Sequence, residues 1–137
     1  MNDVGQLFES IVRGVPVLEV WWERYGASDE FMPEHPYPAI GELAHLVVEA
    51  HRAGGNDGIG QFFRNVESAL QAASHSNRKL LVVGLLEGLQ NAALNAGIGF
   101  DGLSGDFGQV TRQYWLALNE LWAGRVSPVS FNRLIDR

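Results

Sequence analysis

The stretch RKLLVVGLLEGLQNAALNAG, residues 78–97, decides the fold. Between Leu80 and Leu89 it is apolar on almost every side, and Glu87 is its one charged residue. A helix of this kind lies in the middle of a bundle rather than on its surface. A strand over residues 80–86 is the alternative, because short apolar runs are ambiguous. The apolar residues that continue past Leu89 without an early turn signal favour the helix, and with it an all-α protein.

Gly84 and Gly88 stand four residues apart in this stretch. Glycine lowers helix propensity, but its missing side chain lets a neighbouring helix approach closely. We therefore predict a close helix–helix contact at these two positions. The residues expected to be largely buried in the central helix are Leu81, Val82, Leu85, Leu86 and Leu89.

Apolar residues at helical spacing predict further helices on both sides of the central one. These helices cover residues 3–13, 16–25, 40–52, 59–73 and 109–123, followed by a last short turn. The residues expected to cap helices are Ser76 or Asn77, Asp106 and Ser130. Because 137 residues can bury a stable core, we expect a single helical domain, residues 1–137, built as a compact bundle of about six helices.

The helix predicted over residues 16–25 carries apolar side chains on more than one side. One side has Val17, Val20, Trp21 and Arg24, and Leu18, Trp22 and Tyr25 lie close to another. Neighbouring residues of a helix differ in direction by about 100°, so the two tryptophans cannot both point into the core. We expect one of them at the edge of the core.

Residues 26–38, GASDEFMPEHPYP, form the longest stretch that is not predicted to be helical. Its three prolines disfavour helix in the residues before them, and long loops in compact domains are often functional. The stretch places acidic residues beside aromatic ones of the kind that anchor protein interfaces. We therefore predict the centre of a protein-binding site here, with a proline-rich cover over the core as the alternative. The predicted site residues are Asp29, Glu30, Phe31, Glu34 and Tyr37.

The charge is distributed unevenly along the chain. The formal net charge is −6, of which residues 1–49 hold nine acids against two arginines, a net −7, while the remainder holds seven acids against eight bases. An acidic half repels phosphates, which argues against nucleic-acid binding and favours a basic protein partner. Solubility alone is the alternative reason for these acids.

The composition also limits the compartment. The chain has no cysteine, so disulfides and cysteine zinc sites are excluded, and a reducing compartment, the cytoplasm, is expected. The longest apolar run is far shorter than the roughly 20 residues that a membrane span needs.

No motif in the sequence predicts a cofactor or a reaction. GIGFDG at residues 97–102 has the glycine spacing of dinucleotide-binding loops, but it follows a predicted helix instead of a strand. Glu42 and His45 have the spacing of di-iron bundle ligands, but no second Glu-x-x-His accompanies them. We therefore expect no metal, no cofactor and no enzymatic activity.

Glu87 is a charged residue in the middle of the most apolar predicted helix, and its role has two possible explanations. A carboxylate in such surroundings either pairs with a base, for which Arg64 and Arg112 are the candidates, or belongs to a site. Asn91 continues the same polar seam. The alternative to a protein-binding module is thus a small-molecule-binding or enzymatic domain that uses Glu87 and Asn91, or a homodimer whose apolar helix faces pair.

Three stretches carry a resemblance to a known group of proteins. They are PYPAIGELAHLVVEA (36–50), LLVVGLLEGLQNAA (80–93) and FGQVTRQYWLALNELW (107–122). Together they resemble small, uncharacterised, acidic helical bacterial proteins, some of which look like immunity proteins of polymorphic toxin systems. The resemblance spans about residues 7 to 122, and it implies a protein that binds and neutralises a toxin encoded at the same locus. The acidic charge of residues 1–49 favours a basic toxin.

Overall fold

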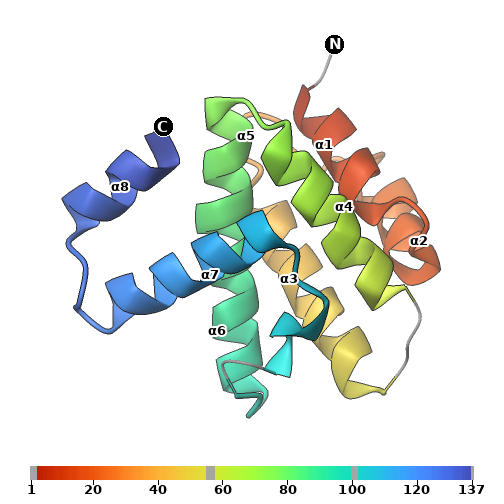
Figure 1. Cartoon of the computed structure of the whole chain (residues 1–137). Helices are drawn as coiled ribbons and strands as arrows, with labels where there is room; N and C mark the ends of the chain where they lie inside the picture. The colour runs from red at the N-terminus through yellow and green to blue at the C-terminus, as the bar shows by residue number, and fades with distance from the viewer. Residues whose placement is uncertain (1–2, 55–57, 100–101, 137) are drawn as a thin grey trace.

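The computed structural model describes residues 3–54, 58–99 and 102–136 (Figure 1). This part of the chain is built from helices and has no strand. The prediction of an all-α bundle is thus confirmed. In chain order the elements are α1 (Asp3–Val12), α2 (Pro16–Tyr25), α3 (Tyr37–Arg52), α4 (Ile59–Gln71), α5 (His75–Lys79), η1 (Leu80–Leu86), α6 (Glu87–Asn95), the short η3 (Ser104–Asp106), α7 (Gln109–Trp122) and α8 (Pro128–Asp136). Elements α5, η1 and α6 follow one another without a break and form the one long helix at the centre of Figure 1. The described part of the chain contains seven helices if these three elements are counted as one and the three-residue η3 is left out.

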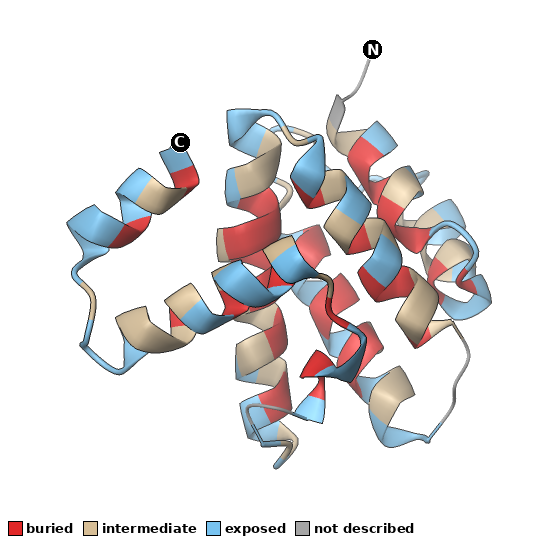
Figure 2. Ribbon diagram, in the orientation of Figure 1, coloured by how far each residue is buried: buried red, intermediate tan, exposed pale blue. Residues whose placement is uncertain are grey.

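The residues of the central helix that were predicted to be buried are buried in the structure. Leu81, Val82, Leu85, Leu86 and Leu89 are each 0% exposed, and buried residues recur along this helix in Figure 2. Its middle segment η1 is a π-helix, in which the backbone hydrogen bonds span one residue more than in an α-helix. The sequence predicts the helix but not this wider turn. Nearly every residue of η1 is buried, so the spacing of its apolar residues does not distinguish a π-helix from an α-helix.

Helix α3 crosses the central helix at the two glycines. A β-carbon at Gly84 would lie 2.9 Å from Cγ2 of Ile40, and one at Gly88 would lie 3.2 Å from Cβ of Ala44. The predicted close contact is confirmed, because an added β-carbon would clash with α3 at Gly84 and would be tightly packed against it at Gly88.

The irregular segment is shorter than predicted, since α3 begins at Tyr37 and includes Pro38. The first helical hydrogen bond joins the Ile40 N–H to the Pro36 carbonyl at 3.0 Å. Proline is tolerated in the first turn of a helix because its missing N–H would have no partner there. The segment between α2 and α3 therefore spans residues 26–36.

Three helix caps differ from the prediction. Ser74, and neither Ser76 nor Asn77, caps α5, because its Oγ accepts a hydrogen bond from the Asn77 N–H at 3.2 Å. Ser127 accepts from the Ser130 N–H at 3.1 Å, so Ser127 is the residue at the start of α8 that acts as the acceptor.

The third difference is at α7, which is capped by Glu67 of α4 instead of Asp106. The Glu67 carboxylate accepts hydrogen bonds from the backbone N–H groups of Val110 and Thr111 and from the Thr111 hydroxyl, at 2.8–3.1 Å. Gly108 makes room for it, since a β-carbon there would lie 2.4 Å from Cδ of Glu67. A cap from a distant helix cannot be inferred from residue spacing near α7.

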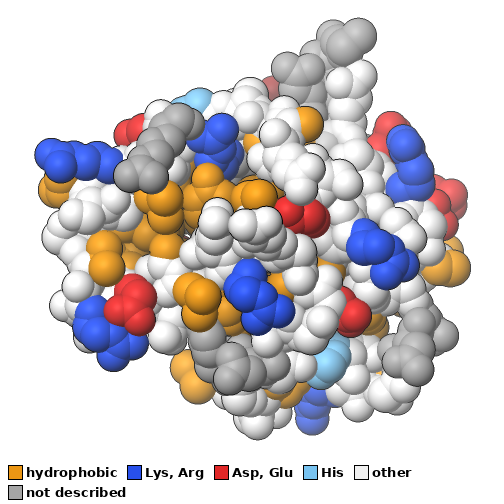
Figure 3. Space-filling model, in the orientation of Figure 1, with side chains coloured by type: hydrophobic (Ala, Val, Ile, Leu, Met, Phe, Trp, Pro, Cys, Tyr) orange, Lys and Arg blue, Asp and Glu red, His pale blue; other side chains and the backbone are white. Residues whose placement is uncertain are grey.

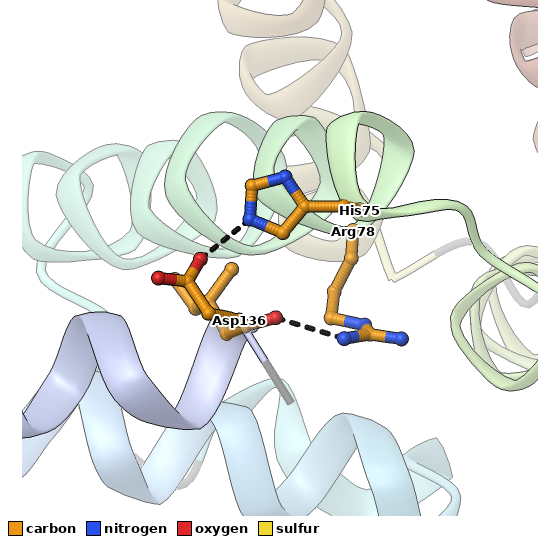
Figure 4. A network of polar contacts seen from close by, with 4 residues as sticks. His75, Arg78 and Asp136 are labelled. Carbon is orange, nitrogen blue, oxygen red and sulfur yellow. Dashed lines mark hydrogen bonds and ion pairs between the residues drawn. The ribbon is translucent and has the colours of Figure 1, made fainter.

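Helix α8 lies at the edge of the bundle and packs through Phe131 and Ile135. Two polar contacts fasten it to α5 (Figure 4). His75 contacts the Asp136 carboxylate, and the Arg78 guanidinium donates to the Ile135 carbonyl at 2.8 Å. On the face drawn in Figure 3, hydrophobic side chains gather on the side of the molecule where α8 lies. Among the described helices, none combines the length and the hydropathy that crossing a membrane requires.

Candidate functional site

An aromatic cluster joins α1, α2 and the segment after α2. The Phe8 ring is buried and stacks on Trp22, with ring centroids 4.8 Å apart and planes 11° apart. Phe31 meets Trp22 and Phe8 edge to face, at centroid distances of 5.0 and 5.7 Å. The sequence predicts Phe31 as a partner-binding residue, but these contacts use its ring to hold the 26–36 segment against α1 and α2.

The other four predicted partner-binding residues are all exposed, but they have different surroundings. Asp29, Glu30 and Glu34 are exposed, but of these only Glu30 lines the groove described below. Tyr37 lies over the central helix, with its ring 3.3 Å from where a β-carbon at Gly84 would be. Burial, and then the nearby Glu87 carboxylate, raise the pKa of Tyr37. Tyr37 thus lies beside Gly84 and Glu87 of the central helix, and it does not line the α2–α3 groove.

An open groove of about 450 Å³ lies between α2 and α3. Its walls are largely apolar, and Val17 and Val20 on the rim are 47% and 50% exposed. The residues that line this α2–α3 groove are Val17, Val20, Trp21, Arg24, Tyr25, Ser28, Glu30, Glu42 and Leu46. It therefore combines an aromatic surface with two carboxylates and one guanidinium.

Two contacts fix the aromatic residues of the groove in place. The Trp21 indole N–H donates to the Glu42 carboxylate at 3.1 Å, and the Trp21 ring stacks on Tyr25 with centroids 5.4 Å apart. Burial raises the pKa of Tyr25, and the carboxylates of Glu42 and Glu30 raise it further. Both carboxylates therefore lie close to the aromatic surface, where they can meet the cationic groups of a ligand.

The sequence contains a signal for this groove in the two apolar sides of the helix at residues 16–25. Leu18 is fully buried, while Trp21 and Trp22 are both half-buried. Trp22 completes the aromatic cluster and Trp21 faces the groove. One apolar side of α2 thus belongs to the core, and the other is exposed on the surface. An apolar side that the core does not need is the sequence signal from which the groove could have been predicted.

Glu87 has neither of the arginine partners predicted for it. Arg64 donates to Gln61, and Arg112 donates to the Ser104 carbonyl. Burial raises the pKa of the Glu87 carboxyl. Glu87 does not line the α2–α3 groove, nor does it line a cavity between α6 and α7 to which Asn91 contributes. The two residues therefore do not share that cavity, and a catalytic site built on the pair gains no support.

The residues of the di-iron-like and dinucleotide-loop-like motifs have ordinary roles in the fold. Glu42 accepts the Trp21 indole hydrogen bond, while His45 is exposed. Across the described ranges, no three histidine or acidic side chains come together in a way that could hold a metal ion. In the GIGFDG segment, Gly97 has φ +75° just after α6, as expected for a helix end, and residues 100 and 101 lie outside the described residues.

Comparison with known proteins gives one match. The family model described as "Domain of unknown function (DUF7674)" matches residues 8–123, which covers α1 through α7 except for the first turns of α1. No curated protein and no solved structure matches the chain.

Proposed function

The chain belongs to the DUF7674 family, whose function is unknown, and we propose that it is a protein-binding module whose α2–α3 groove receives a basic segment of a partner. The observation that carries this proposal is a half-buried aromatic surface, formed by Trp21 and Tyr25, that lines an open groove beside two carboxylates. In this proposal the protein catalyses no reaction of its own and acts in the cytoplasm, as its lack of cysteine suggests.

The aromatic residues of the groove suit the centre of an interface. Tryptophan and tyrosine are enriched among the residues that dominate binding energies, because they bury a large area with few rotatable bonds. Trp21 is already oriented by Glu42 and Tyr25, so binding would cost little ordering of its side chain. Val17 and Val20 extend the apolar surface toward the rim.

The charges around the groove favour a basic partner. Glu30 and Glu42 line it, and Asp29 and Glu34 are exposed on the adjoining 26–36 segment. Complementary charges of this kind speed association with a basic protein and make the rate sensitive to salt. Arg24 is the base among the lining residues, and its charge opposes such a partner. Removing a carboxylate from the groove should therefore slow association with a basic partner, whereas removing the Arg24 charge should speed it.

The first test is a selection of binders from a random peptide library. We expect peptides that combine lysine or arginine with an apolar residue. The Glu30→Gln/Glu42→Gln variant should then associate with the best peptide about 2–10-fold more slowly at low salt, whereas Arg24→Gln should associate faster. Glutamine at position 42 can still accept the Trp21 hydrogen bond, so the melting temperature should change little.

A matched control separates the groove from the neighbouring loop. Asp29→Asn/Glu34→Gln removes the same amount of charge from exposed positions that do not line the groove. It should slow association less than the groove variant does. Selected peptides without basic residues, or a larger loss in the loop variant, would contradict a groove-centred site.

The specific form of the proposal is an immunity-type protein whose basic partner is a toxin encoded beside it. Its support is the resemblance of the three helical stretches to immunity-like proteins and the acidic groove. The test is co-expression with the product of the adjacent gene. Growth should be inhibited by that product alone, restored by the parent protein and restored less well by Glu30→Gln/Glu42→Gln. An adjacent product without toxicity would refute this form and leave the peptide test of the groove unaffected.

A further inference from the structure

A second cavity, of about 370 Å³, lies between α6 and α7 and is remote in sequence from the α2–α3 groove. Its volume is within the range of small-molecule sites. The residues that line this α6–α7 pocket are Gln90, Asn91, Ala93, Leu94, Ile98, Trp115, Asn119 and Trp122. Trp115 is buried, whereas Leu94 and Trp122 are 75% and 60% exposed, so the pocket has an apolar rim open to solvent.

The polar groups of the pocket are three side-chain amides. Gln90 donates from Nε2 to the Trp115 carbonyl at 3.1 Å, which fixes the orientation of its amide. Within the described residues, the side chains of Asn91 and Asn119 make no hydrogen bond to protein. An amide carries two donor hydrogens and an acceptor oxygen in one plane. Asn91 and Asn119 therefore have their full hydrogen-bonding capacity available to a ligand.

No charged side chain is among the described residues that line the pocket. A phosphate, carboxylate or ammonium group would lose its hydration there without gaining an opposite charge, so a charged ligand is disfavoured. The pocket instead suits an uncharged ligand with a flat apolar face for a tryptophan ring and a polar edge for an amide.

We propose that the α6–α7 pocket binds an uncharged nitrogen heterocycle of the nucleobase class, free or as its nucleoside. Asparagine and glutamine pair with the edge of adenine through a donor and an acceptor at once, and bases stack on tryptophan. A sugar has no flat edge that matches this planar pair. The proposal concerns a separate site and does not depend on the function of the α2–α3 groove.

The test follows the tryptophan indole N–H signals in nitrogen-labelled protein during titration. Adenine, guanine, uracil, their nucleosides and adenosine monophosphate are added separately, with a neutral disaccharide as a further arm. At least one base should shift the signals of Trp122 and Trp115 in a saturable way and leave Trp21 unchanged. Its nucleoside should do the same if the site accepts the sugar, and the phosphate should add no affinity.

Variants on the two free amides complete the test. Asn119→Leu and Asn91→Leu should each weaken binding about 5-fold or more, since one bidentate amide–base pair is lost. Asn95→Leu is the matched control, because Asn95 is exposed on α6 and does not line the pocket. The proposal is overturned if no base or nucleoside gives a saturable shift at millimolar concentration, if adenosine monophosphate or the disaccharide binds more tightly, or if the control weakens binding as much as Asn119→Leu.

Discussion

Two half-buried glutamates experience opposite electrostatic environments. Burial alone would raise the pKa of Glu67, but hydrogen bonds from the Thr111 N–H, Gln71, the Thr111 hydroxyl and the Val110 N–H lower it below its ordinary value. Glu87 is also partly buried, but no described residue donates a hydrogen bond to it, and burial raises its pKa. The charged form is thus stabilised by the fold at Glu67 and destabilised at Glu87, which gives the two residues opposite expected effects on stability.

Glu67→Gln should lower the free energy of unfolding at neutral pH by about 1–2 kcal/mol, because it removes the charge from a helix cap. A lowered pKa contributes stability above the pKa of the unfolded chain and loses it as the pH falls through the folded-state pKa. The deficit of the variant should therefore shrink in acid. Urea unfolding of the parent and the variant at several pH values from about 7 to 3 measures this difference in the free energy of unfolding. Glu49→Gln, at an exposed pair with Arg52, is the control and should change stability by less than about 0.5 kcal/mol. A deficit independent of pH would contradict the cap.

Glu87→Gln should have the opposite effect. A raised carboxyl pKa means that the fold loses stability as the pH rises from the unfolded-state pKa through the folded-state pKa. A neutral glutamine avoids this loss, so the variant should match the parent in acid and be at least as stable at neutral pH. The same urea series measures the difference. A variant less stable than the parent at neutral pH would indicate an ionised Glu87 with a favourable partner.

At the scale of elements, the helices themselves could be predicted but some of their contacts could not. The bounds of α2 follow from Pro16 and Gly26, and the end of α3 from the glycines after Arg52, because these are local signals. The cap of α7 comes from Glu67 on another helix, which residue spacing near α7 cannot reveal. The contacts of Phe31 with Phe8 and Trp22 could not be predicted for the same reason, since only the fold brings these rings together.

A pair of glycine substitutions tests the contact between α3 and the central helix. Gly84→Ala should destabilise the protein by about 1–3 kcal/mol, because overpacking against Ile40 outweighs the gain in helix propensity. Gly41→Ala is the matched control on α3, where an added β-carbon meets nothing within 4 Å. It should stabilise the protein by up to about 1 kcal/mol. Equal effects in thermal unfolding of the two variants would show that the helices do not approach this closely.

At the scale of the whole molecule, the acidic first part of the chain supplies both walls of the α2–α3 groove. The charge asymmetry and the 26–38 region pointed to this part of the protein, and Glu30 is a predicted site residue that lines the groove. Trp21, Tyr25 and Glu42 were not predicted as site residues, because their meeting depends on how α2 lies against α3. The sequence thus indicates the region and its charge, whereas the aromatic surface is a property of the packed helices.

The four tryptophan indole signals provide the most direct measurement of the central claim, that the α2–α3 groove binds a basic partner. Trp21 lines this groove, Trp22 belongs to the aromatic cluster beside it, and Trp115 and Trp122 line the α6–α7 pocket. Nitrogen-labelled protein is titrated with the tightest basic peptide from the selection. We expect a saturable shift of the Trp21 signal, while the Trp122 signal stays in place. Saturable binding that moves Trp122 and leaves Trp21 unchanged would contradict this claim.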